Sequence, residues 1–427
     1  MKRSIAILGI LCLGAATAFA GGQAEEVVED VDRIRVLSTT TSSEDYIEYV
    51  KETYYNETGI EVEWEVLPFT AYMEALEVQL SAGDQDFDVF NVDVPLVASY
   101  AIRNFLLPLD DFFTEAERES WLPSAYEAGT HDGVLVSPPM RTSTQLLYYN
   151  KDLLDAAGID APGPAPEDRL TWEEARAIAE QVADPGAGVW GLVLEQHDRP
   201  YQLLPLPESK GGGPGIGEDG LEIAGYLTND GWIEAMQFYG DKYADGIAPR
   251  GTGDQQEMFL AGDVALYVGG EWNLGLLREV DFEWGVAPHP YFEGGEPVTP
   301  TGSWHWGVNA HTDRPNAAAA FVKALTTDTT YVDPLLDEGR LVGHRRIAEL
   351  TMDDVEEFGL PFTPEALSLV QYELEHTARP RPASIGYLEW EDMVRDAILD
   401  IVAGEDVEET LRRTEDRLDR EFEKYRR

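Results

Sequence analysis

Two tryptophans with a histidine between them form the most distinctive aromatic segment of the chain. Trp304 and Trp306 lie in the run Gly302-Ser303-Trp304-His305-Trp306-Gly307. In an extended strand alternate side chains share a face, so both indoles are expected on one side and His305 on the other. Indole faces between small residues are suited to stacking on flat, apolar parts of a ligand. We therefore predict that Trp304 and Trp306 contact a ligand; the alternative for either ring is a place in the core.

A second aromatic candidate follows a pair of glycines. Trp272 and Glu271 come directly after Gly269-Gly270, at the end of a predicted strand and the start of a predicted helix. The indole offers another stacking face, and the carboxylate offers a hydrogen-bond acceptor. The competing role for Glu271 is that of an acid that favours a helix N-terminus.

Hydroxyl and carboxyl groups follow two of the predicted strands. The run from Thr39 to Ser43 follows the first strand, and from it and its neighbour we select Thr41, Ser42 and Glu44. Asp93 ends a later strand, and open α/β sheets bind ligands beyond the carboxyl ends of their strands. The alternative roles are capping of the next helix, most readily by one of the serines, and a turn or N-cap acid for Asp93.

Cationic and polar candidates lie further along the chain. Arg141, Ser143 and Thr144 share one segment, and Arg381 lies in an Arg-Pro-rich segment near the C-terminal helices. A guanidinium presents planar donors that suit vicinal hydroxyls or a carboxylate. A structural ion pair between segments is the alternative for Arg381. Gln196 and His197, after another strand, are weaker candidates.

The chain has no motif of a nucleophilic or zinc-dependent hydrolase. Neither Gly-x-Ser-x-Gly nor His-Glu-x-x-His occurs, and the seven histidines are scattered. Carboxylates are so numerous that a glycosidase pair is neither recognisable nor excluded by counting. We predict a protein that is not an enzyme and that needs no cofactor and no metal.

The charge is strongly acidic throughout. The 427 residues include 81 Asp and Glu against 31 Lys and Arg, which gives a formal net charge of −50. This charge disfavours nucleic-acid binding. It favours a protein adapted to a salty solvent that screens its self-repulsion, over one that attracts a cationic ligand. Thermal unfolding at rising salt would test that interpretation.

The N-terminus has the pattern of a secretory leader. Lys2 and Arg3 precede a short apolar run, and Ala18-Phe19-Ala20 matches a cleavage site after Ala20. Cys12, the single cysteine, lies within this leader. Lipid attachment at Cys12 is the alternative, but Leu11 stands where a small residue is expected. We predict an exported, periplasmic protein without a transmembrane helix.

Strand and helix patterns alternate along the chain. Apolar residues alternate with glutamates over 60–66, a half-buried strand, and helices are predicted at 44–58 and 70–82. A strand at 88–92 completes a β-α-β rhythm, which predicts a parallel sheet flanked by helices. Thr171 and Glu174 form a capping box at the start of a helix that runs to Ala183. The segments 315–325, 363–375, 388–403 and the residues after 407 are also predicted helices.

Eight segments together resemble extracellular solute-binding proteins that serve ABC sugar importers. The strongest is SPPMRTSTQLLYYNKDLLDAAGI (137–159), which resembles the segment that crosses between the two lobes of that family. The others, in the family's order, are DFDVFNVD (86–93), LLPLDDFF (106–113), LTWEEA (170–175), FLAGDVAL (259–266), WGVAPHP (284–290), PNAAAAFVKAL (315–325) and ARPRPASIGYLEWEDMV (378–394). The resemblance covers roughly residues 33–425.

The resemblance implies an α/β, two-lobe type II periplasmic binding protein fold with the ligand cleft between the lobes. Its first lobe would take 33–142 and 299–342, and its second 143–298 and 343–427. It marks Asp93 as a hydroxyl acceptor and Trp304 and Trp272 as ligand contacts, whereas Tyr148 and Tyr149 would be structural.

The function that the resemblance implies is binding of a sugar or oligosaccharide by a monomer and its delivery to the transmembrane subunits of an ABC permease. Alternatives are a polyol, a sugar acid or a glycerophosphodiester as the ligand, or a secreted carbohydrate-active enzyme.

Overall fold

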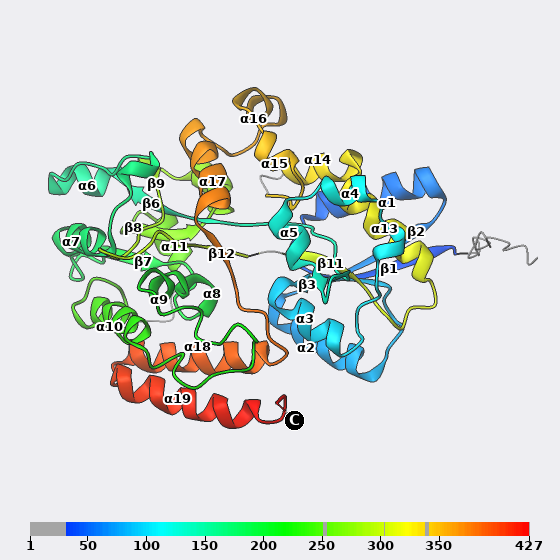
Figure 1. Cartoon of the computed structure of the whole chain (residues 1–427). Coiled ribbons are helices and arrows are strands. Elements are labelled where there is room, and N and C mark those ends of the chain that lie inside the picture. The colour runs from blue at the N-terminus through cyan, green and yellow to red at the C-terminus, as the bar shows by residue number, and fades with distance from the viewer. Residues whose placement is uncertain (1–30, 251–253, 303, 338–340, 427) are drawn as a thin grey trace, which may run out of the picture. The chain divides into compact units, whose positions relative to one another are not determined.

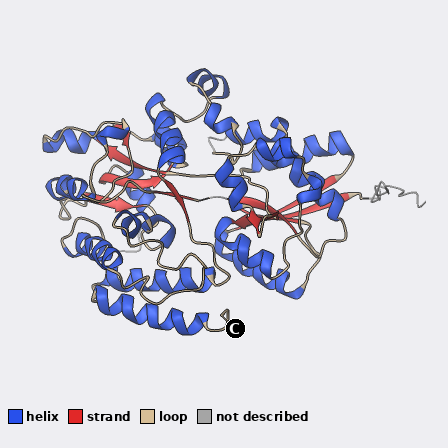
Figure 2. Cartoon of the chain, viewed as in Figure 1, coloured by secondary structure: helices blue, strands red, loops and turns tan. Residues whose placement is uncertain are grey.

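The computed structural model describes residues 31–250, 254–302, 304–337 and 341–426 (Figure 1). The predicted leader, including Cys12 and the cleavage site after Ala20, lies outside the described residues, as does Ser303. No helix in the described ranges combines the length and apolar character needed to cross a bilayer. The strands form two separate four-stranded sheets and two small two-stranded ones (Figure 2).

The first sheet has the strand order β11-β3-β1-β2. Its strands are β1 (Arg33–Thr39), β2 (Glu61–Leu67), β3 (Val89–Asp93) and β11 (Trp304–Val308). β1 runs parallel to β2 and β3, as the β-α-β rhythm predicts, whereas β11 pairs antiparallel with β3. The helices that pack on it are α1 (Glu44–Thr58), α2 (Phe69–Ala82) and α13 (Pro315–Thr327), and α14 (Thr329–Asp337) packs on α1 and α13.

Local signals set the bounds of these elements. Val62 is buried in β2 whereas the glutamates on either side of it are exposed, as predicted. Val66, which the alternation also placed inward, is 38% exposed. α1 begins where Ser43 accepts a hydrogen bond from the backbone N–H of Tyr46 at 3.0 Å. It ends at Gly59, whose φ of 76° is left-handed and suits a glycine. A serine of the Thr39–Ser43 run therefore does cap this helix, as the alternative reading held.

The second sheet has the order β7-β8-β6-β9 and is mixed in direction. Its strands are β6 (Gln145–Asn150), β7 (Trp190–Leu194), β8 (Val264–Gly270) and β9 (Trp284–Ala287). β7 pairs parallel with β8. β6 lies between β8 and β9 and runs antiparallel to both. α6 (Lys151–Ala157), α7 (Trp172–Val182) and α11 (Gln255–Leu260) pack on this sheet. Tyr148, predicted to be structural, is fully buried in β6.

Two short parallel strands join distant parts of the chain. β10 (Thr299–Thr301) precedes the first sheet's β11, and β12 (Ala378–Pro380) follows α17 (Pro364–His376). The N–H of Thr299 donates to the carbonyl of Thr377 at 3.0 Å. Glu373 of α17 is buried beneath this pair and accepts from the Thr299 hydroxyl at 2.8 Å.

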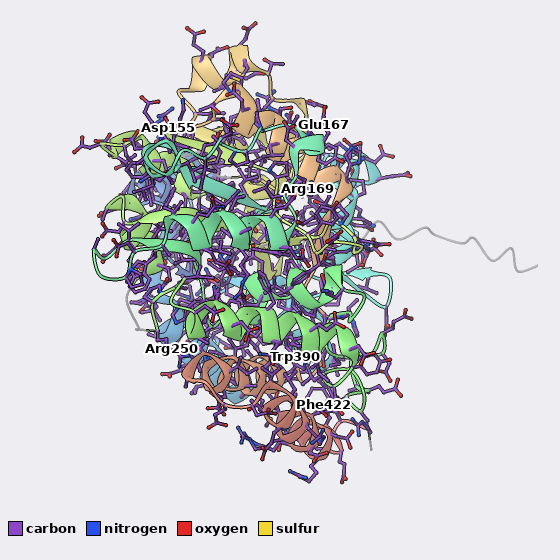
Figure 3. The ribbon with its side chains drawn as sticks, turned by 90° about the vertical axis from the view of Figure 1, so that its left-hand side faces the viewer. Asp155, Glu167, Arg169, Arg250, Trp390 and Phe422 are labelled. Atoms are coloured by element: carbon purple, nitrogen blue, oxygen red, sulfur yellow. The ribbon has the colours of Figure 1, made fainter. Side chains whose placement is uncertain are left out.

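The chain ends in two antiparallel-packed helices, α18 (Tyr387–Ala403) and α19 (Val407–Phe422), which also contact α10 (Asp230–Ala244). Figure 3 labels Trp390 of α18 and Phe422 of α19, both buried. The remaining elements are η1 (Val94–Leu96), α3 (Val97–Ile102), η2 (Asp110–Phe112), α4 (Glu115–Glu119), α5 (Pro123–Ala128), β4 (Thr130–His131), β5 (Val134–Leu135), η3 (Pro166–Asp168), α8 (Pro200–Leu203), α9 (Pro205–Ser209), α12 (Asn273–Leu276), η4 (Leu277–Glu279), α15 (Arg346–Glu349) and α16 (Met352–Phe358).

Lys242 of α10 is a buried amine that costs stability. It is 1% exposed, and its Nζ lies 4.1 Å from the ring centroid of Tyr239 and 4.7 Å from that of Tyr243. Within the described ranges this nitrogen has no hydrogen-bond partner. Burial lowers the pKa of Lys242 well below its ordinary 10.5. Between the lowered pKa of the folded state and about 10.4, Lys242 is protonated in the unfolded chain but not in the folded chain. The free energy of unfolding therefore rises with pH across that range.

We expect Lys242→Met to raise the free energy of unfolding by about 2 kcal/mol at pH 7, because it keeps the apolar stem and removes the amine. The gain should shrink as the pH approaches about 10.4. Urea denaturation at several pH values measures both effects. Lys151→Met, at an exposed lysine, is the control and should change stability by less than about 0.5 kcal/mol. A gain that does not vary with pH would contradict this account.

Candidate ligand-binding site

A buried ion pair joins two of the predicted site residues. Arg381 donates from Nη1 to Oδ2 of Asp93 at 2.9 Å and from Nη2 to Oδ1, a two-pronged contact across 288 residues of sequence. Both side chains are 6% exposed. Burial alone would lower the pKa of Arg381, but Asp93, Tyr387 and Glu391 together outweigh burial and raise that pKa well above its usual value. The side chain of Asp93 makes no cap bond to the following turn, so its described role is this ion pair.

The two tryptophans of β11 lie at different depths. Trp304 pairs with Asp93 in the ladder and is half-buried, with its ring 6.1 Å from that of Phe69 and 6.4 Å from that of Tyr72. Trp306 is 1% exposed and packs edge-on against Trp64 at 5.6 Å. Trp304 therefore keeps part of its surface exposed, whereas Trp306 occupies the core position that was its alternative.

His305, between them, is fully buried. Its Nδ1 lies 2.7 Å from the carbonyl oxygen of Ser137. Burial lowers the pKa of His305 to about 4, so the ring is neutral near pH 7.

Tyr201, at the start of α8, connects Arg381 with Ser143. The guanidinium of Arg381 lies 5.0 Å from the Tyr201 ring centroid. The Tyr201 hydroxyl lies 2.9 Å from Oγ of Ser143, which also hydrogen-bonds the backbone of Gly302. A Cβ at position 302 would lie 2.9 Å from both Ser143 Oγ and the Tyr201 ring, which explains the glycine. Burial raises the pKa of Tyr201 to about 12, so the hydroxyl keeps its proton.

Arg141, Thr144 and Glu271 are buried next to these residues. The N–H of Arg141 donates to the carbonyl of Trp304 at 2.9 Å. Glu271 Oε2 accepts from the N–H of Thr144 at 3.1 Å, and the N–H of Glu271 donates back to the carbonyl of Thr144 at 3.2 Å. Glu271 thus links the residue before β6 to the residue after β8. It lies two residues before α12, which begins at Asn273.

Trp272 is half-buried and held at its ring nitrogen. Its Nε1–H donates to Oε1 of Glu195 at 2.7 Å. Glu195 follows directly after β7, at the carboxyl end of that strand.

The predicted residues after β1 differ in burial and in hydrogen bonding. Thr41 is buried, and its hydroxyl donates to Oδ1 of Asn91 in β3 at 2.8 Å. Ser42 has a buried Oγ without a hydrogen-bond partner among the described residues. Glu44 is exposed on the first turn of α1.

Several buried polar atoms at these strand ends keep hydrogen-bonding capacity. Within the described part of the chain, Thr39 Oγ1, Ser42 Oγ, Thr144 Oγ1 and Arg381 Nε have no hydrogen-bond partner. Buried polar groups in native proteins are almost always satisfied. A ligand rich in hydroxyl groups would satisfy this kind of arrangement.

Comparison with protein families identifies the family of the chain. The family model described as "Bacterial extracellular solute-binding protein" matches residues 38–331, more than half of the chain. The chain belongs to this family. It is an extracellular solute-binding protein of the kind that works with ABC transporters, and the family is one of binding proteins, not enzymes.

The relatives of this solute-binding protein are distant in sequence. The maltodextrin-binding protein MdxE of Bacillus subtilis is 25% identical over 340 residues, which cover 77% of each chain. The ABC substrate-binding protein Lmo0181 of Listeria monocytogenes, solved with cycloalternan, has a TM-score of 0.81 at 19% identity and covers 92% of this chain and 99% of its own. A solute-binding protein of Thermotoga lettingae, bound to α-D-tagatose, has a TM-score of 0.77 at 18% identity and covers 92% and 100%. These likenesses show the two-lobe α/β fold.

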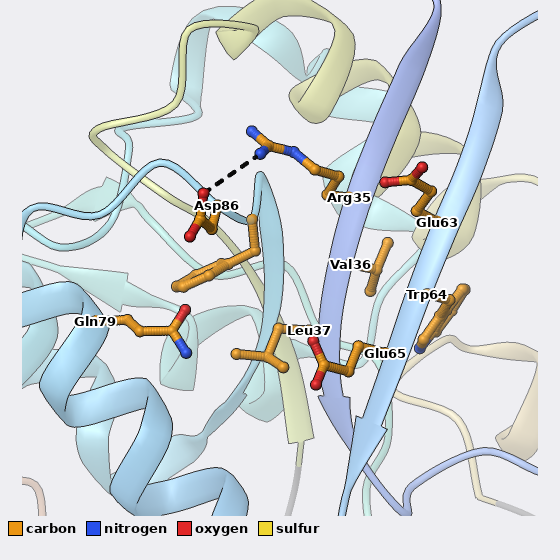
Figure 4. A pocket seen from close by; sticks show the side chains of 9 residues that line it. Arg35, Val36, Leu37, Glu63, Trp64, Glu65, Gln79 and Asp86 are labelled. Carbon is orange, nitrogen blue, oxygen red and sulfur yellow. Dashed lines mark ion pairs between the residues drawn. The ribbon is translucent and has the colours of Figure 1, made fainter.

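The solute-binding protein also has a surface pocket that lies apart from the predicted residues (Figure 4). Its volume is about 220 Å³, and Arg35, Glu63, Gln79 and Asp86 are among the residues that line it. Arg35 and Asp86 form an ion pair of 3.9 Å there. Pockets for small-molecule ligands usually have volumes of about 300–1,000 Å³, so we assign no ligand to it.

The sequence alone did not point to Glu195, Tyr201 or Phe69. Glu195 ends a strand as Asp93 does, so the strand-end rule that selected Asp93 also applied to Glu195. Tyr201 and Phe69 gave no such signal, because their relation to Arg381 and Trp304 is set by the fold.

Proposed function

We propose that this solute-binding protein binds a neutral sugar or oligosaccharide. The supporting observation is the continuous set of contacts from Trp304 and Asp93 through Arg381 and Tyr201 to Ser143. It offers aromatic faces for the C–H surfaces of a sugar and buried donors and acceptors for its hydroxyls. The relatives named for maltodextrin and solved with cycloalternan or tagatose point to the same ligand class.

The site favours a neutral ligand over an anionic one. Arg141 and Arg381 are the two buried guanidiniums of the set, and Arg381 is already neutralised by Asp93. A sugar acid or a glycerophosphodiester would have to compete with that carboxylate for the guanidinium. A polyol remains compatible with the same donors and acceptors.

The proposal includes two lobes and a permease. The first lobe would take 33–142 and 299–342 and the second 143–298 and 343–427, with closure about the segments that cross between them. For the ligand-contacting set we propose Thr41, Ser42, Asp93, Arg141, Ser143, Glu271, Trp272, Trp304 and Arg381, with Glu44 as a peripheral member. Trp306, which lies in the core, is not part of this set. A monomer exported to the periplasm, with its leader cleaved after Ala20, would present the bound form to the transmembrane subunits of an ABC importer.

The test is a thermal-shift screen of the chain that starts at Gly21, with maltotriose, maltodextrins, cycloalternan, tagatose, polyols and glycerophosphates. A ligand that binds only the folded state raises the Tm by mass action. We expect a shift with one neutral sugar class. Trp304→Ala should weaken binding of that sugar by about 30-fold or more, since a central tryptophan contact is worth about 2 kcal/mol.

Trp190→Ala is the matched control for the Trp304 substitution. Trp190 is also a half-buried strand tryptophan, but it begins β7, at the end of the strand opposite Glu195. Its replacement should leave the sugar affinity within about threefold, whatever it does to the Tm. A Tm shift with glycerophosphates and none with any sugar would discard the carbohydrate proposal and leave the family unchanged.

A further inference from the structure

Glu195 is the most heavily hydrogen-bonded carboxylate near the proposed site. Its Oε1 accepts from Trp272 Nε1 at 2.7 Å and from Gln256 Nε2 at 3.3 Å. Its Oε2 accepts from the N–H of Gly270 at 3.0 Å, Asn273 Nδ2 at 3.1 Å and Gln202 Nε2 at 3.3 Å. These donors come from α8, α11, the end of β8 and the segment that leads into α12.

These bonds leave Glu195 no capacity for a ligand. An ionised carboxylate has about four acceptor positions, and five donors already point at this one. Burial raises the pKa of Glu195, and the bonds from Trp272, Gly270 and Asn273 oppose that rise by favouring the ionised form. A sugar hydroxyl has no open lone pair to use on Glu195, so any role in binding must act through its neighbours.

The Trp272 ring is fixed from a second side by Gly270. A Cβ at position 270 would lie 2.1–2.3 Å from three carbons of the Trp272 six-membered ring. The ring therefore lies directly against the backbone at Gly270, where only a glycine fits. The glycine fixes one face of the indole, and Glu195 fixes the direction of its N–H.

We propose that Glu195 is a positioning residue that holds the Trp272 indole in place as a ligand-stacking face before ligand arrives. The inference rests on the proposed function in taking Trp272 as a ligand contact. A side chain that is already ordered does not lose rotamer freedom on binding, so its contact with ligand gains affinity.

The role needs both acceptor oxygens of Glu195, and not only its shape. A glutamine at position 195 has one oxygen and one NH2 group. Because each carboxylate oxygen of Glu195 receives at least two donors, the NH2 group would face donors in either orientation. Glu195→Gln thus keeps nearly the same shape, but it replaces an acceptor with a donor in the hydrogen-bond network that holds Trp272.

The first test needs no ligand and follows the indole N–H signals by nuclear magnetic resonance. Trp272→Phe assigns the Trp272 signal. We expect E195Q to shift that signal and to speed its exchange with solvent. The Trp284 indole, which donates to the carbonyl of Leu277 at 3.0 Å, is an internal reference that should not move. An unchanged Trp272 signal in folded E195Q would overturn the proposal.

The second test is a double-mutant cycle on the affinity for maltotriose. We expect E195Q to weaken binding about tenfold in the native background, which corresponds to about 1.4 kcal/mol, and less than twofold in the W272F background. Equal losses in both backgrounds would overturn the proposal. E174Q, at the capping box of α7, is the control for loss of a glutamate charge and should not change affinity.

Failure of the proposed function gives a different result. If the native protein binds neither maltotriose nor any other sugar of the screen, the carbohydrate assignment is lost. The indole signals of the ligand-free protein still decide whether Glu195 positions Trp272.

Discussion

Replacing Glu373 with alanine is expected to lower the free energy of unfolding by about 3–5 kcal/mol. Glu373 is 0% exposed and lies 2.9 Å from Nη1 of Arg169, whose side chain is 6% exposed. It also accepts from the Thr299 hydroxyl at 2.8 Å, from the Thr377 hydroxyl and from the N–H of His289 at 3.2 Å. Its removal leaves a buried guanidinium, labelled in Figure 3, without its carboxylate.

The size of this effect comes from what is left behind and not from the ion pair itself. Replacing both partners of a buried ion pair with apolar residues is often neutral. We therefore expect the double variant Arg169→Met with Glu373→Met to be more stable than Glu373→Ala alone. Glu375→Ala, two residues along the same helix at an exposed glutamate, is the control and should cost less than about 0.5 kcal/mol. Urea denaturation measures all three, and equal losses for Glu373→Ala and Glu375→Ala would refute the argument.

Glu373 also connects two segments that are distant in the sequence. It hydrogen-bonds a residue of β10 and the residue just before β12, the two strands through which distant parts of the chain run side by side. A fixed acid beneath two such strands sets their register, because both threonine hydroxyls point at the same carboxylate.

The local elements could be predicted from the sequence because their signals are local. The helix at 44–58 has the bounds of α1, and the alternation over 60–66 corresponds to β2. The capping box of Thr171 and Glu174 is present at α7. Each signal acts within a few residues, through caps and periodicity, so no knowledge of the fold was needed. The direction of β6 and β9 was not predictable, because strand pairing depends on the connections and not on the strands' own residues.

The site was only partly predictable, because its partners are far apart in the chain. Alternation placed Trp304 and Trp306 on one face of β11. It does not predict that Trp304 is only half-buried whereas Trp306 is fully buried in the core. Glu195 receives donors up to 78 residues away, from Asn273. Its role could not be seen in one segment of sequence, whereas Asp93 could be selected because a strand end is itself a local signal.

Replacing Asp93 with alanine is the second change with a large expected effect. It should cost about 3–5 kcal/mol, since Arg381 would remain buried between the Tyr201 and Tyr387 rings, at 5.0 and 5.9 Å, without a carboxylate. Asp86→Ala is the control. Asp86 also has an arginine partner, Arg35 at 3.9 Å, but its side chain is 84% exposed, and exposed pairs contribute about 0–1 kcal/mol.

The Asp93 substitution also separates a structural role from a role in binding. If Asp93 only neutralises Arg381, the double variant Asp93→Ala with Arg381→Met should recover most of the stability lost in Asp93→Ala. It should also bind whichever sugar the native protein binds as tightly as Arg381→Met alone does. If Asp93 also accepts a ligand hydroxyl, stability should recover while the affinity of the double variant is at least about tenfold weaker than that of Arg381→Met. We expect the second result, because Asp93 pairs directly with Trp304 in the ladder and so lies beside the ring proposed to stack on the sugar. Urea denaturation and titration calorimetry on these variants decide between the two, and equal affinities of the double variant and Arg381→Met would remove Asp93 from the ligand-contacting set.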